Sequence, residues 1–203
     1  MNHYFTNNPN YISNRRKISF RFLTILETFY SDDNVFSKDT LDYGSRVLLE
    51  TLMKQDINGK VLDLGCGIGY IGIMLKKYKD IDLTMSDINQ QASDLALENS
   101  RLYKQDNKVL QSDGFANIED NFDIIVSNPP IRVGKKIMYS LFKESYDHLN
   151  EDGRLYLVIR AQQGAASTVK YLQTFQAKVE VIEKKGGYWI IKLLKSVDNI
   201  DNN

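Results

Sequence analysis

From residue 60 onward, short apolar runs alternate with longer segments in which apolar residues recur every three or four positions. Short runs of this kind are typical of strands, and the longer segments are typical of amphipathic helices. The predicted strands are residues 60–64, 81–86, 108–111, 122–127, 154–159, 178–184 and 187–194. The predicted helices are residues 69–78, 90–103, 134–149 and 163–175. This alternation predicts an α/β domain with a mainly parallel seven-stranded sheet and helices on both faces.

The two ends of the chain depart from the alternation. Gly186 and Gly187 separate the last two predicted strands, and a Gly-Gly pair between such runs predicts an antiparallel terminal hairpin. Residues 196–203 are polar with little apolar content, so we expect a disordered tail. Before residue 60, segments 17–22 and 24–30 are predicted to pair as strands, and segment 41–52 is predicted to be an amphipathic helix. We interpret residues 1–59 as an N-terminal extension packed on the core of a single domain, residues 1–195.

A glycine-rich loop follows the first core strand. Asp63 lies at the strand's end, and Gly65, Gly67 and Gly69 alternate before the next helix. Glycine lets the backbone turn sharply, and it lets a ligand lie against bare main chain at the carboxyl end of a strand. The loop therefore predicts a site for a nucleotide-like ligand.

Two ligand classes fit this loop. Its last two glycines and Gly72 satisfy the dinucleotide pattern G-x-G-x-x-G, with Asp87 near the position of a dehydrogenase ribose acid. The run from Asp63 fits a D-x-G-x-G-x-G frame better, and a carboxylate there would repel a pyrophosphate. Asp63 can instead hold a cationic amino-acid moiety, directly or through water. We therefore favour S-adenosyl-L-methionine, although the glycine pattern taken alone leaves a dinucleotide enzyme open.

Carboxylates also follow the next two predicted strands. Asp87 comes after segment 81–86, and Asp113 comes after segment 108–111. With the glycine loop, these spacings resemble the Rossmann-like class I methyltransferases over residues 36–194. The resemblance implies that Asp87 grips the ribose hydroxyls of the methyl donor and that Asp113 lies by its adenine amine. It further implies donor-binding roles for the neighbouring residues Cys66, Ile88, Gly114 and Phe115.

The predicted strand 122–127 ends in Asn128, Pro129 and Pro130. Proline keeps the first two of these residues out of a helix and fixes a rigid, extended turn that presents acceptors. An exocyclic amine is a poor nucleophile because its lone pair is spread into a ring. An Asn side-chain oxygen that accepts one N–H, beside a backbone carbonyl that accepts another, can aim that lone pair at a methyl sulfonium. We therefore predict that the three residues form a catalytic loop for N-methylation, with Asn128 also beside the methyl donor; a purely structural turn is the alternative.

The flanking residues bear on which amine is methylated, because Asn-Pro-Pro enzymes modify nucleobase amines and glutamine side chains. Ile131 stands where many adenine and glutamine branches have a stacking aromatic residue. The continuation through Arg132, and the segment 35–45, resemble the methyltransferase small domain family of 16S rRNA guanine-N2 enzymes. This resemblance implies guanine N2 as the substrate, 16S rRNA or the 30S subunit as the partner, and a donor pocket that includes Asp42, Gly44 and Ser45. A protein-glutamine or small-molecule N-methyltransferase stays open, as does a non-catalytic factor in ribosome assembly.

Charge and composition limit these alternatives. The 26 Lys and Arg balance the 26 Asp and Glu, so any RNA affinity must come from a local basic face. The candidate residues for such a face are Arg132, Lys135 and Lys136 after the catalytic loop, and Arg15, Arg16, Lys17 and Arg21 upstream. One cysteine and two histidines exclude a disulfide framework and leave too few ligands for a zinc site. Neither histidine, at positions 3 and 148, is placed as a catalytic acid or base. With no secretory signal or membrane-length apolar segment, we expect a cytoplasmic, metal-free protein, and a monomer.

Overall fold

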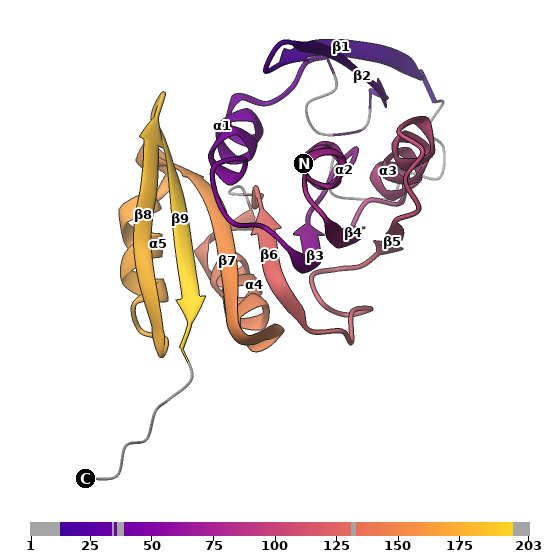
Figure 1. The fold of residues 1–203 in the computed structure, drawn as a ribbon. Helices are drawn as coiled ribbons and strands as arrows, with labels where there is room; N and C mark the ends of the chain where they lie inside the picture. Colours follow the sequence, from indigo (N-terminus) through magenta and orange to yellow (C-terminus); the bar gives the residue numbers. More distant parts are fainter. Residues whose placement is uncertain (1–12, 34, 36–38, 131–132, 197–203) are drawn as a thin grey trace, which may run out of the picture.

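The computed structural model describes residues 13–33, 35, 39–130 and 133–196. Its strands are β1 (Arg16–Phe22), β2 (Ile25–Ser31), β3 (Gly59–Leu64), β4 (Ile81–Asp87), β5 (Lys108–Gln111), β6 (Phe122–Ser127), β7 (Leu149–Arg160), β8 (Ala177–Lys185) and β9 (Tyr188–Lys195). Its helices are α1 (Tyr43–Leu52), α2 (Tyr70–Tyr78), α3 (Gln90–Leu102), α4 (Lys135–Asp147) and α5 (Ala165–Leu172), with a short 3-10 helix, η3 (Ala161–Gln163). A seven-stranded sheet has the order β5-β4-β3-β6-β7-β9-β8, and β1 and β2 form a separate two-stranded sheet (Figure 1).

The central sheet is parallel through five of its strands. β3 pairs in parallel with β4 on one side and with β6 on the other, and the pairing continues to β5 and β7. β9 runs antiparallel to both β7 and β8. The predicted mainly parallel sheet with an antiparallel terminal hairpin is therefore confirmed. The carboxyl ends of β3 and β6 form a topological switch point, which is where open α/β sheets bind ligands.

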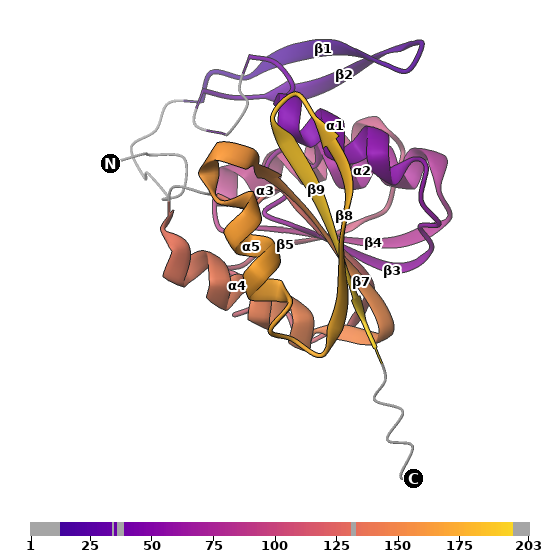
Figure 2. The same cartoon turned by 90° about the vertical axis from the view of Figure 1, so that its left-hand side faces the viewer.

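Helices cover both faces of the sheet, as predicted (Figure 2). Val61 of β3 packs in the cluster that contains the apolar side chains of α1, α2 and α3. Its neighbours Leu62 and Leu64 pack in the opposite cluster with α4 and α5. Successive side chains of a strand point to opposite faces, so a central strand covered by helices on both sides has buried residues in succession. This is why residues 61–64 are buried in succession, Asp63 included.

Two glycines set element boundaries that differ from the predicted ones. The predicted helix 163–175 is confined to Ala165–Leu172, because Gly164 has a φ of 103° and separates the helix from η3. Gly187 belongs to the turn and not to the last strand, since Gly186 and Gly187 have φ values of 56° and 80°. Two residues with positive φ suit the tight turn of a hairpin.

The junction between α4 and β7 also differs from the sequence pattern, which ends a helix at residue 149 and begins a strand at 154. Helix α4 ends at Asp147, and β7 begins at Leu149, which pairs with Phe122. The register then shifts before Arg154 pairs with Ile124, and Asp152 within this irregularity has a φ of 56°. A single buried leucine at a strand start has no periodicity of its own, so the pattern assigns it to the preceding helix.

The predicted N-terminal strand pair is confirmed, with β1 and β2 antiparallel from Arg16↔Ser31 to Phe22↔Ile25. Asn99 of α3 joins this hairpin to the core. Its Oδ1 accepts the Tyr30 N–H at 2.7 Å, and its Nδ2 donates to the carbonyls of Tyr30 and Ile68 at 3.0 and 2.9 Å. The Asn99 side chain is fully buried, so these bonds are shielded from water. A residue of β2 and a residue of the glycine loop thus share one side chain.

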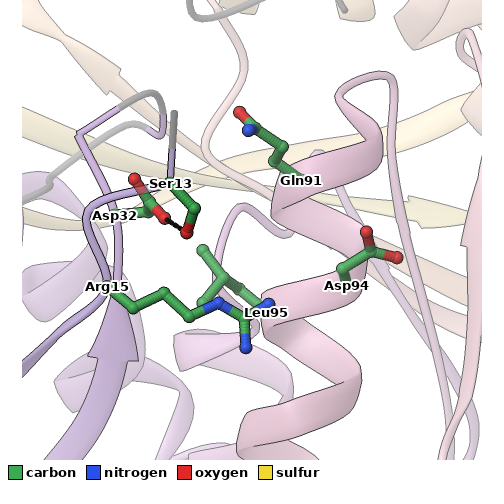
Figure 3. A pocket seen from close by; sticks show the side chains of 6 residues that line it. All are labelled: Ser13, Arg15, Asp32, Gln91, Asp94 and Leu95. Carbon is green, nitrogen blue, oxygen red and sulfur yellow. Dashed lines mark hydrogen bonds between the residues drawn. The ribbon is translucent and has the colours of Figure 1, made fainter. Parts of the chain in front are cut away.

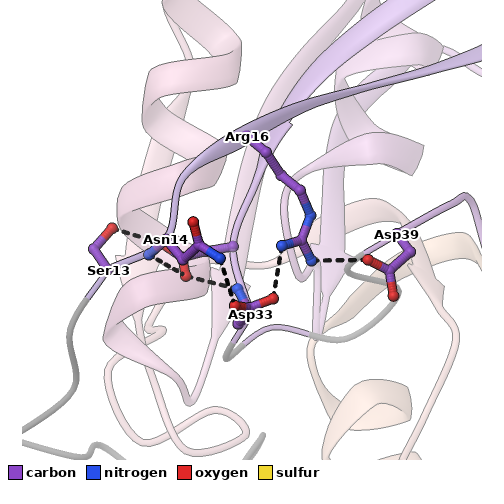
Figure 4. Close-up of polar contacts among 6 residues, drawn as sticks. Ser13, Asn14, Arg16, Asp33 and Asp39 are labelled. Carbon is purple, nitrogen blue, oxygen red and sulfur yellow. Dashed lines mark hydrogen bonds and ion pairs between the residues drawn. The ribbon is translucent and has the colours of Figure 1, made fainter.

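Two residues of the upstream basic cluster are held in ion pairs. Arg16 contacts Asp33 at 2.6 Å and Asp39 at 2.9 Å (Figure 4), and Arg15 pairs with Glu98 of α3. Their guanidinium groups therefore serve contacts within the chain. This weakens the interpretation of the upstream cluster as a nucleic-acid surface.

Asp63 is a buried carboxylate beneath the glycine loop. Its side chain is enclosed at the end of β3, with an exposed fraction of 1% for the residue, and its Oδ2 accepts the Gly72 N–H at 2.8 Å. Its Oδ1 is buried without a hydrogen-bond partner among the described residues. Burial raises the pKa of Asp63 to about 7, against a lowering by the Gly72 N–H bond and with a further raising by Asp87. The folded protein therefore keeps Asp63 protonated at pH values well above those at which an aspartate usually ionises.

We predict that Asp63 makes the free energy of unfolding fall as the pH rises from about 4 to about 7. In the unfolded chain an Asp ionises near pKa ~3.9, whereas the folded protein holds the Asp63 proton until about pH 7. In this window the folded state binds more protons, so rising pH favours the unfolded state. The difference between the pKa of Asp63 in the folded and in the unfolded chain limits this loss of unfolding free energy to roughly 4 kcal/mol. Urea unfolding at pH 5 and 7.5 should show a weaker pH dependence in Asp63→Asn than in the wild type; equal dependences would contradict this assignment.

Candidate active site

The glycine-rich loop between β3 and α2 lies at the carboxyl edge of the sheet, against the end of β4. The N–H groups of Gly65 and Cys66 donate to the Ser86 carbonyl at 2.8 and 2.9 Å, and the Gly67 N–H donates to Asp87 Oδ2 at 2.9 Å. Gly65 and Gly67 have φ values of 71° and 54°, and a Cβ on either would meet nothing within 4 Å. The loop thus presents bare backbone to open space, as a site for a flat or elongated ligand requires.

The other predicted residues of the loop face the interior. Gly69 is the N-cap of α2, and a Cβ there would lie 2.9 Å from Ile73 Cδ1. Cys66 is buried, and burial raises the pKa of its thiol well above the ordinary value. These two residues shape the loop, and they offer no free polar side chain to a ligand.

Asp87 ends β4 and lies directly under the glycine loop. Its Oδ2 accepts the Gly67 N–H, and its Oδ1 accepts the Asn89 N–H at 2.9 Å. Burial raises the pKa of Asp87, while the N–H groups of Asn89, Gly67 and Ile88 lower it. The side chain of Ile88 is 36% exposed next to this carboxylate. A half-exposed acid beside an exposed apolar side chain suits a ribose and the adenine that it carries.

The residues after β5 are brought beside Asp87, because the Ser112 N–H donates to the Asp87 carbonyl at 2.9 Å. The Asp113 side chain is exposed and free to meet a ligand. Phe115 is different, since its ring is buried and stacks on His148 with the centroids 4.4 Å apart. Packing therefore occupies the Phe115 side chain, and the carbonyls of Gly114 and Phe115 already accept the Ser112 hydroxyl at 2.9 Å and the Ile118 N–H at 3.0 Å.

Asn128 lies at the end of β6 and is held by the start of α1. Its Nδ2 donates to Asp42 Oδ2 and to Ser45 Oγ, both at 2.9 Å. Asp42 is the N-cap of α1, and the same Oδ2 accepts the Ser45 N–H at 2.8 Å. A Cβ on Gly44 would lie 2.8 Å from Tyr188 Cε1 and 3.0 Å from Asp42 Oδ2, so only glycine fits this corner. The structure thus gathers the predicted residues of segment 35–45 around the predicted catalytic asparagine.

Ser127 is a site residue that the sequence analysis missed. Its buried Oγ donates to the Leu64 carbonyl at 2.7 Å and so ties the end of β6 to the end of β3. A serine at the end of the apolar run Ile124–Val126, directly before Asn-Pro-Pro, was the available signal. The bond fixes the Asn-Pro-Pro turn relative to the glycine loop.

The rest of the predicted catalytic loop is only partly described. Pro129 is buried, and Pro130 is half-buried with its carbonyl accepting the Val133 N–H at 3.3 Å. Lys135 and Lys136 are exposed at the start of α4. The predicted RNA-contact residues Ile131 and Arg132, part of segment 35–45, and the predicted tail after residue 196 lie outside the described residues.

A cavity of about 150 Å³ lies elsewhere, between the N-terminal hairpin and α3 (Figure 3). Its lining residues are Ser13, Arg15, Asp32, Gln91, Asp94 and Leu95. None of them is a predicted donor-binding or catalytic residue. In the part of the chain that the structure describes, no three His, Cys, Asp or Glu side chains gather as metal ligands, and no helix is long and apolar enough to cross a membrane.

Relatives by sequence fall into two groups. An uncharacterised protein of Bacillus subtilis, YbxB, is 41% identical over 197 residues, which is 95% of this chain and 98% of that protein. Ribosomal RNA small subunit methyltransferase C of Actinobacillus pleuropneumoniae is 45% identical over 137 residues, but the match spans 63% of this chain and only 40% of that protein. The match therefore covers less than half the length of this methyltransferase.

Solved structures share the fold at lower identity. A Thermus (T. thermophilus) 16S rRNA N2 G1207 methyltransferase, RsmC, in complex with AdoMet and guanosine, superposes with a TM-score of 0.80 at 24% identity; the match covers 92% of this chain and 52% of that chain. A ribosomal protein L11 methylase from Lactobacillus delbrueckii has a TM-score of 0.64 at 22% identity, with 76% and 78% covered. At these identities the two structures support the fold alone.

The model of the methyltransferase small domain family matches residues 27–192. These residues include most of β2, the glycine loop and the Asn-Pro-Pro turn. That match extends over much more than half of the chain. The open backbone at Gly65 and Gly67, the unpartnered Asp63 Oδ1 and the Asp87 carboxylate fit the methyl donor that this family uses. The protein therefore belongs to the methyltransferase small domain family and uses S-adenosylmethionine as its methyl donor.

Proposed function

We propose that this protein transfers the methyl group of S-adenosylmethionine to the exocyclic N2 amine of a guanine in 16S rRNA. The observation that carries the proposal is the orientation of Asn128. Its Nδ2 is engaged by Asp42 and Ser45, while its Oδ1 has no hydrogen-bond partner among the described residues. A free amide oxygen at the end of β6, beside the glycine loop, is an acceptor for an amine N–H.

Three features of the chain would hold the methyl donor. Asp87 at the end of β4 would accept the ribose hydroxyls beside the N–H groups of Gly67 and Asn89 that it already accepts. Asp63 lies beneath the loop, and its Oδ1 has no hydrogen-bond partner among the described residues; a cationic amino-acid moiety, held directly or through water, would favour its ionised form. Bare backbone at Gly65 and Gly67 permits close approach. When bound, S-adenosylmethionine supplies a methyl group on a sulfonium that leaves as a neutral thioether.

The chain's part in the chemistry is to orient the acceptor amine. Asn128 Oδ1 accepts one N–H, and the carbonyl of Asn128 or Pro129 accepts the other, because the Pro130 carbonyl already accepts the Val133 N–H. Both contacts turn the nitrogen lone pair toward the methyl group. As the N–C bond forms and the S–C bond breaks, the nitrogen becomes cationic, and its proton passes to solvent. His148 plays no part, since its ring stacks on Phe115 and its Nδ1 contacts the Asp120 carbonyl at 2.9 Å.

The choice of 16S rRNA guanine rests on the relatives. Several sequence relatives are named ribosomal RNA small subunit methyltransferase C, and the T. thermophilus structure is of a 16S rRNA N2 guanine enzyme with guanosine bound. A base reaches such an edge only when it is turned out of its stack. We therefore expect an unpaired or locally opened guanine to react faster than one in a stable duplex. Lys135 and Lys136, exposed at the start of α4, follow the catalytic loop and offer cations to the RNA backbone.

We predict that Asp87→Ala weakens binding of S-adenosylhomocysteine at least tenfold, because two hydroxyls lose a charged acceptor. Isothermal titration calorimetry measures this directly. Asp94→Ala, which removes an exposed carboxylate of the neighbouring helix α3, is the matched control and should bind like the wild type. Tight NAD binding by the wild type, without a response to S-adenosylhomocysteine, would contradict the assigned ligand.

We predict that Asn128→Ala lowers kcat on the order of a hundredfold or more, while the affinity for S-adenosylhomocysteine stays within about twofold. The physical reason is that Asn128 contacts the acceptor, whereas the glycine loop and Asp87 hold the methyl donor. Turnover on 30S subunits and on naked 16S rRNA is measured with labelled donor, and the product is identified by nucleoside mass spectrometry. Asn150→Ala, which loses a contact to Asp123 at the opposite edge of the sheet, is the control. A methyl group on protein or on another nucleobase position would disprove the proposed substrate.

We predict that Lys136→Ala weakens RNA binding at every sequence and flattens the slope of log affinity against log salt by about one unit. Filter binding between 50 and 200 mM salt, as an illustrative range, gives the slope. Lys178→Ala removes a lysine that is exposed at the start of β8, and it should leave the slope unchanged. Identical slopes for Lys136→Ala and the wild type would make Lys136 an ordinary surface residue.

A further inference from the structure

We propose that Asp42 and Ser45 are positioning residues that hold the Asn128 amide with its carbonyl oxygen toward the acceptor amine. The inference rests on the proposed function, because it presumes that Asn128 accepts an amine N–H. It changes the role of Asp42 and Ser45, which the family resemblance assigns to the pocket of the methyl donor. The observation behind it is that both residues contact Asn128, across 86 and 83 positions of sequence.

The chemistry of the partners decides which end of the amide faces the substrate. The oxygen and nitrogen of an Asn side chain have almost the same shape, so hydrogen-bond partners fix their orientation. A carboxylate oxygen accepts hydrogen bonds, and Asn128 directs Nδ2 toward Asp42 Oδ2 at 2.9 Å. The opposite orientation would bring two oxygens together and would present an NH₂ group to the incoming amine. The Asp42 contact therefore selects the one orientation that leaves Oδ1 for the substrate.

Asp42 is itself fixed, so that it can serve as a rigid support. Its Oδ2 accepts the Ser45 N–H in the first turn of α1, and Gly44 between them lies against the ring of Tyr188. Asp42 also lies close enough to Tyr188 to raise the pKa of its hydroxyl. Burial is the larger cause of that raised pKa, and the Asp42 carboxylate adds to it. Helix α1, the last strand and the Asn-Pro-Pro turn thus meet at one point. The same contact explains why position 128 is Asn, since an Asp there would face the Asp42 carboxylate.

The test separates helix capping from side-chain positioning. Asp42→Ser keeps an N-cap for α1 but is too short to reach Asn128, whereas Asp42→Asn keeps an acceptor oxygen of the same length. Ser45→Ala removes one of the two bonds to Asn128. Ser140→Ala, which loses an exposed contact to Glu144 on α4, is the control. For each variant, kcat and KM are measured on 30S subunits, and the dissociation constant of S-adenosylhomocysteine is measured by calorimetry.

We expect Asp42→Ser to lower kcat tenfold or more, with the dissociation constant of S-adenosylhomocysteine within about twofold of the wild type. Asp42→Asn should lose less activity than Asp42→Ser, and Ser45→Ala should fall between the wild type and Asp42→Ser. A wild-type kcat in Asp42→Ser would overturn the proposal. So would a parallel loss of methyl-donor affinity, because the residues would then serve the donor pocket.

A second readout does not depend on turnover. The side-chain NH₂ of Asn128 is held by two acceptors, so its ¹H–¹⁵N signals should be shifted and slow to exchange with water. Asp42→Ser should move these signals and speed their exchange, whereas Ser140→Ala should leave them in place. Should the wild type methylate no RNA, the proposed function fails, yet these spectra still decide whether Asp42 fixes the amide. Unchanged Asn128 signals in Asp42→Ser would refute the positioning role even in an enzyme that methylates guanine.

Discussion

The parallel pairing of β3 with β6 is the constraint on which the site depends. The register aligns Leu64 with Ser127, and the Ser127 hydroxyl donates to the Leu64 carbonyl at 2.7 Å. The glycine loop leaves one of these strands and the Asn-Pro-Pro turn leaves the other, at the same edge of the sheet. The proposed methyl transfer needs the two reacting groups within a few ångströms and in line, and this pairing keeps the loop and the turn side by side. A slip by one residue would reverse the faces of the β6 side chains and remove that alignment.

The N-terminal extension takes part in the same site. Asp42 and Ser45 of α1 contact Asn128, and the buried Asn99 joins the β2 residue Tyr30 to Ile68 in the glycine loop. The first of these contacts reaches the Asn-Pro-Pro turn, and the second reaches the glycine loop. An amide with three hydrogen bonds in a buried place is costly to disturb, because any group left unpaired there is not rehydrated. The extension therefore gives the loop and the turn a common support.

Two carboxylates, Glu27 and Asp63, are both buried but differ in their hydrogen-bond and ion-pair partners. Glu27 of β2, which is 3% exposed, is met by Lys77 at 2.6 Å and by the Tyr103 hydroxyl at 2.8 Å. Asp63 forms no ion pair within the described part of the chain, where its Oδ1 also has no hydrogen-bond partner, and burial raises its pKa to about 7. An acid that is buried and paired attaches the hairpin to α2 and α3. An acid that is buried and unpaired costs stability, and such a cost is expected where a cationic ligand supplies the missing partner.

Sequence alone determined the features that depend on local backbone chemistry. The apolar runs predicted the strands of the sheet, Gly186 and Gly187 predicted the terminal hairpin, and the residue types of the glycine loop and the Asn-Pro-Pro turn marked both halves of the site. These features are readable because glycine permits φ values that other residues rarely adopt, because proline fixes φ at its own position, and because burial on both faces shows directly in composition. Element boundaries at residues 149 and 163 were less readable, since a lone leucine or glycine has no period.

Only the tertiary structure decided which side chains meet. It placed Asp42 against Asn128, directed the ring of Phe115 onto His148, and used Arg15 and Arg16 in ion pairs within the chain. None of these contacts is local, and each joins residues whose types fit several partners equally well. A carboxylate at a helix start is most simply an N-cap, and Asp42 is one, but its second contact depends on where β6 ends in space. Residue type sets what a side chain can bind, whereas the packing of the sheet and helices sets which partner lies within reach.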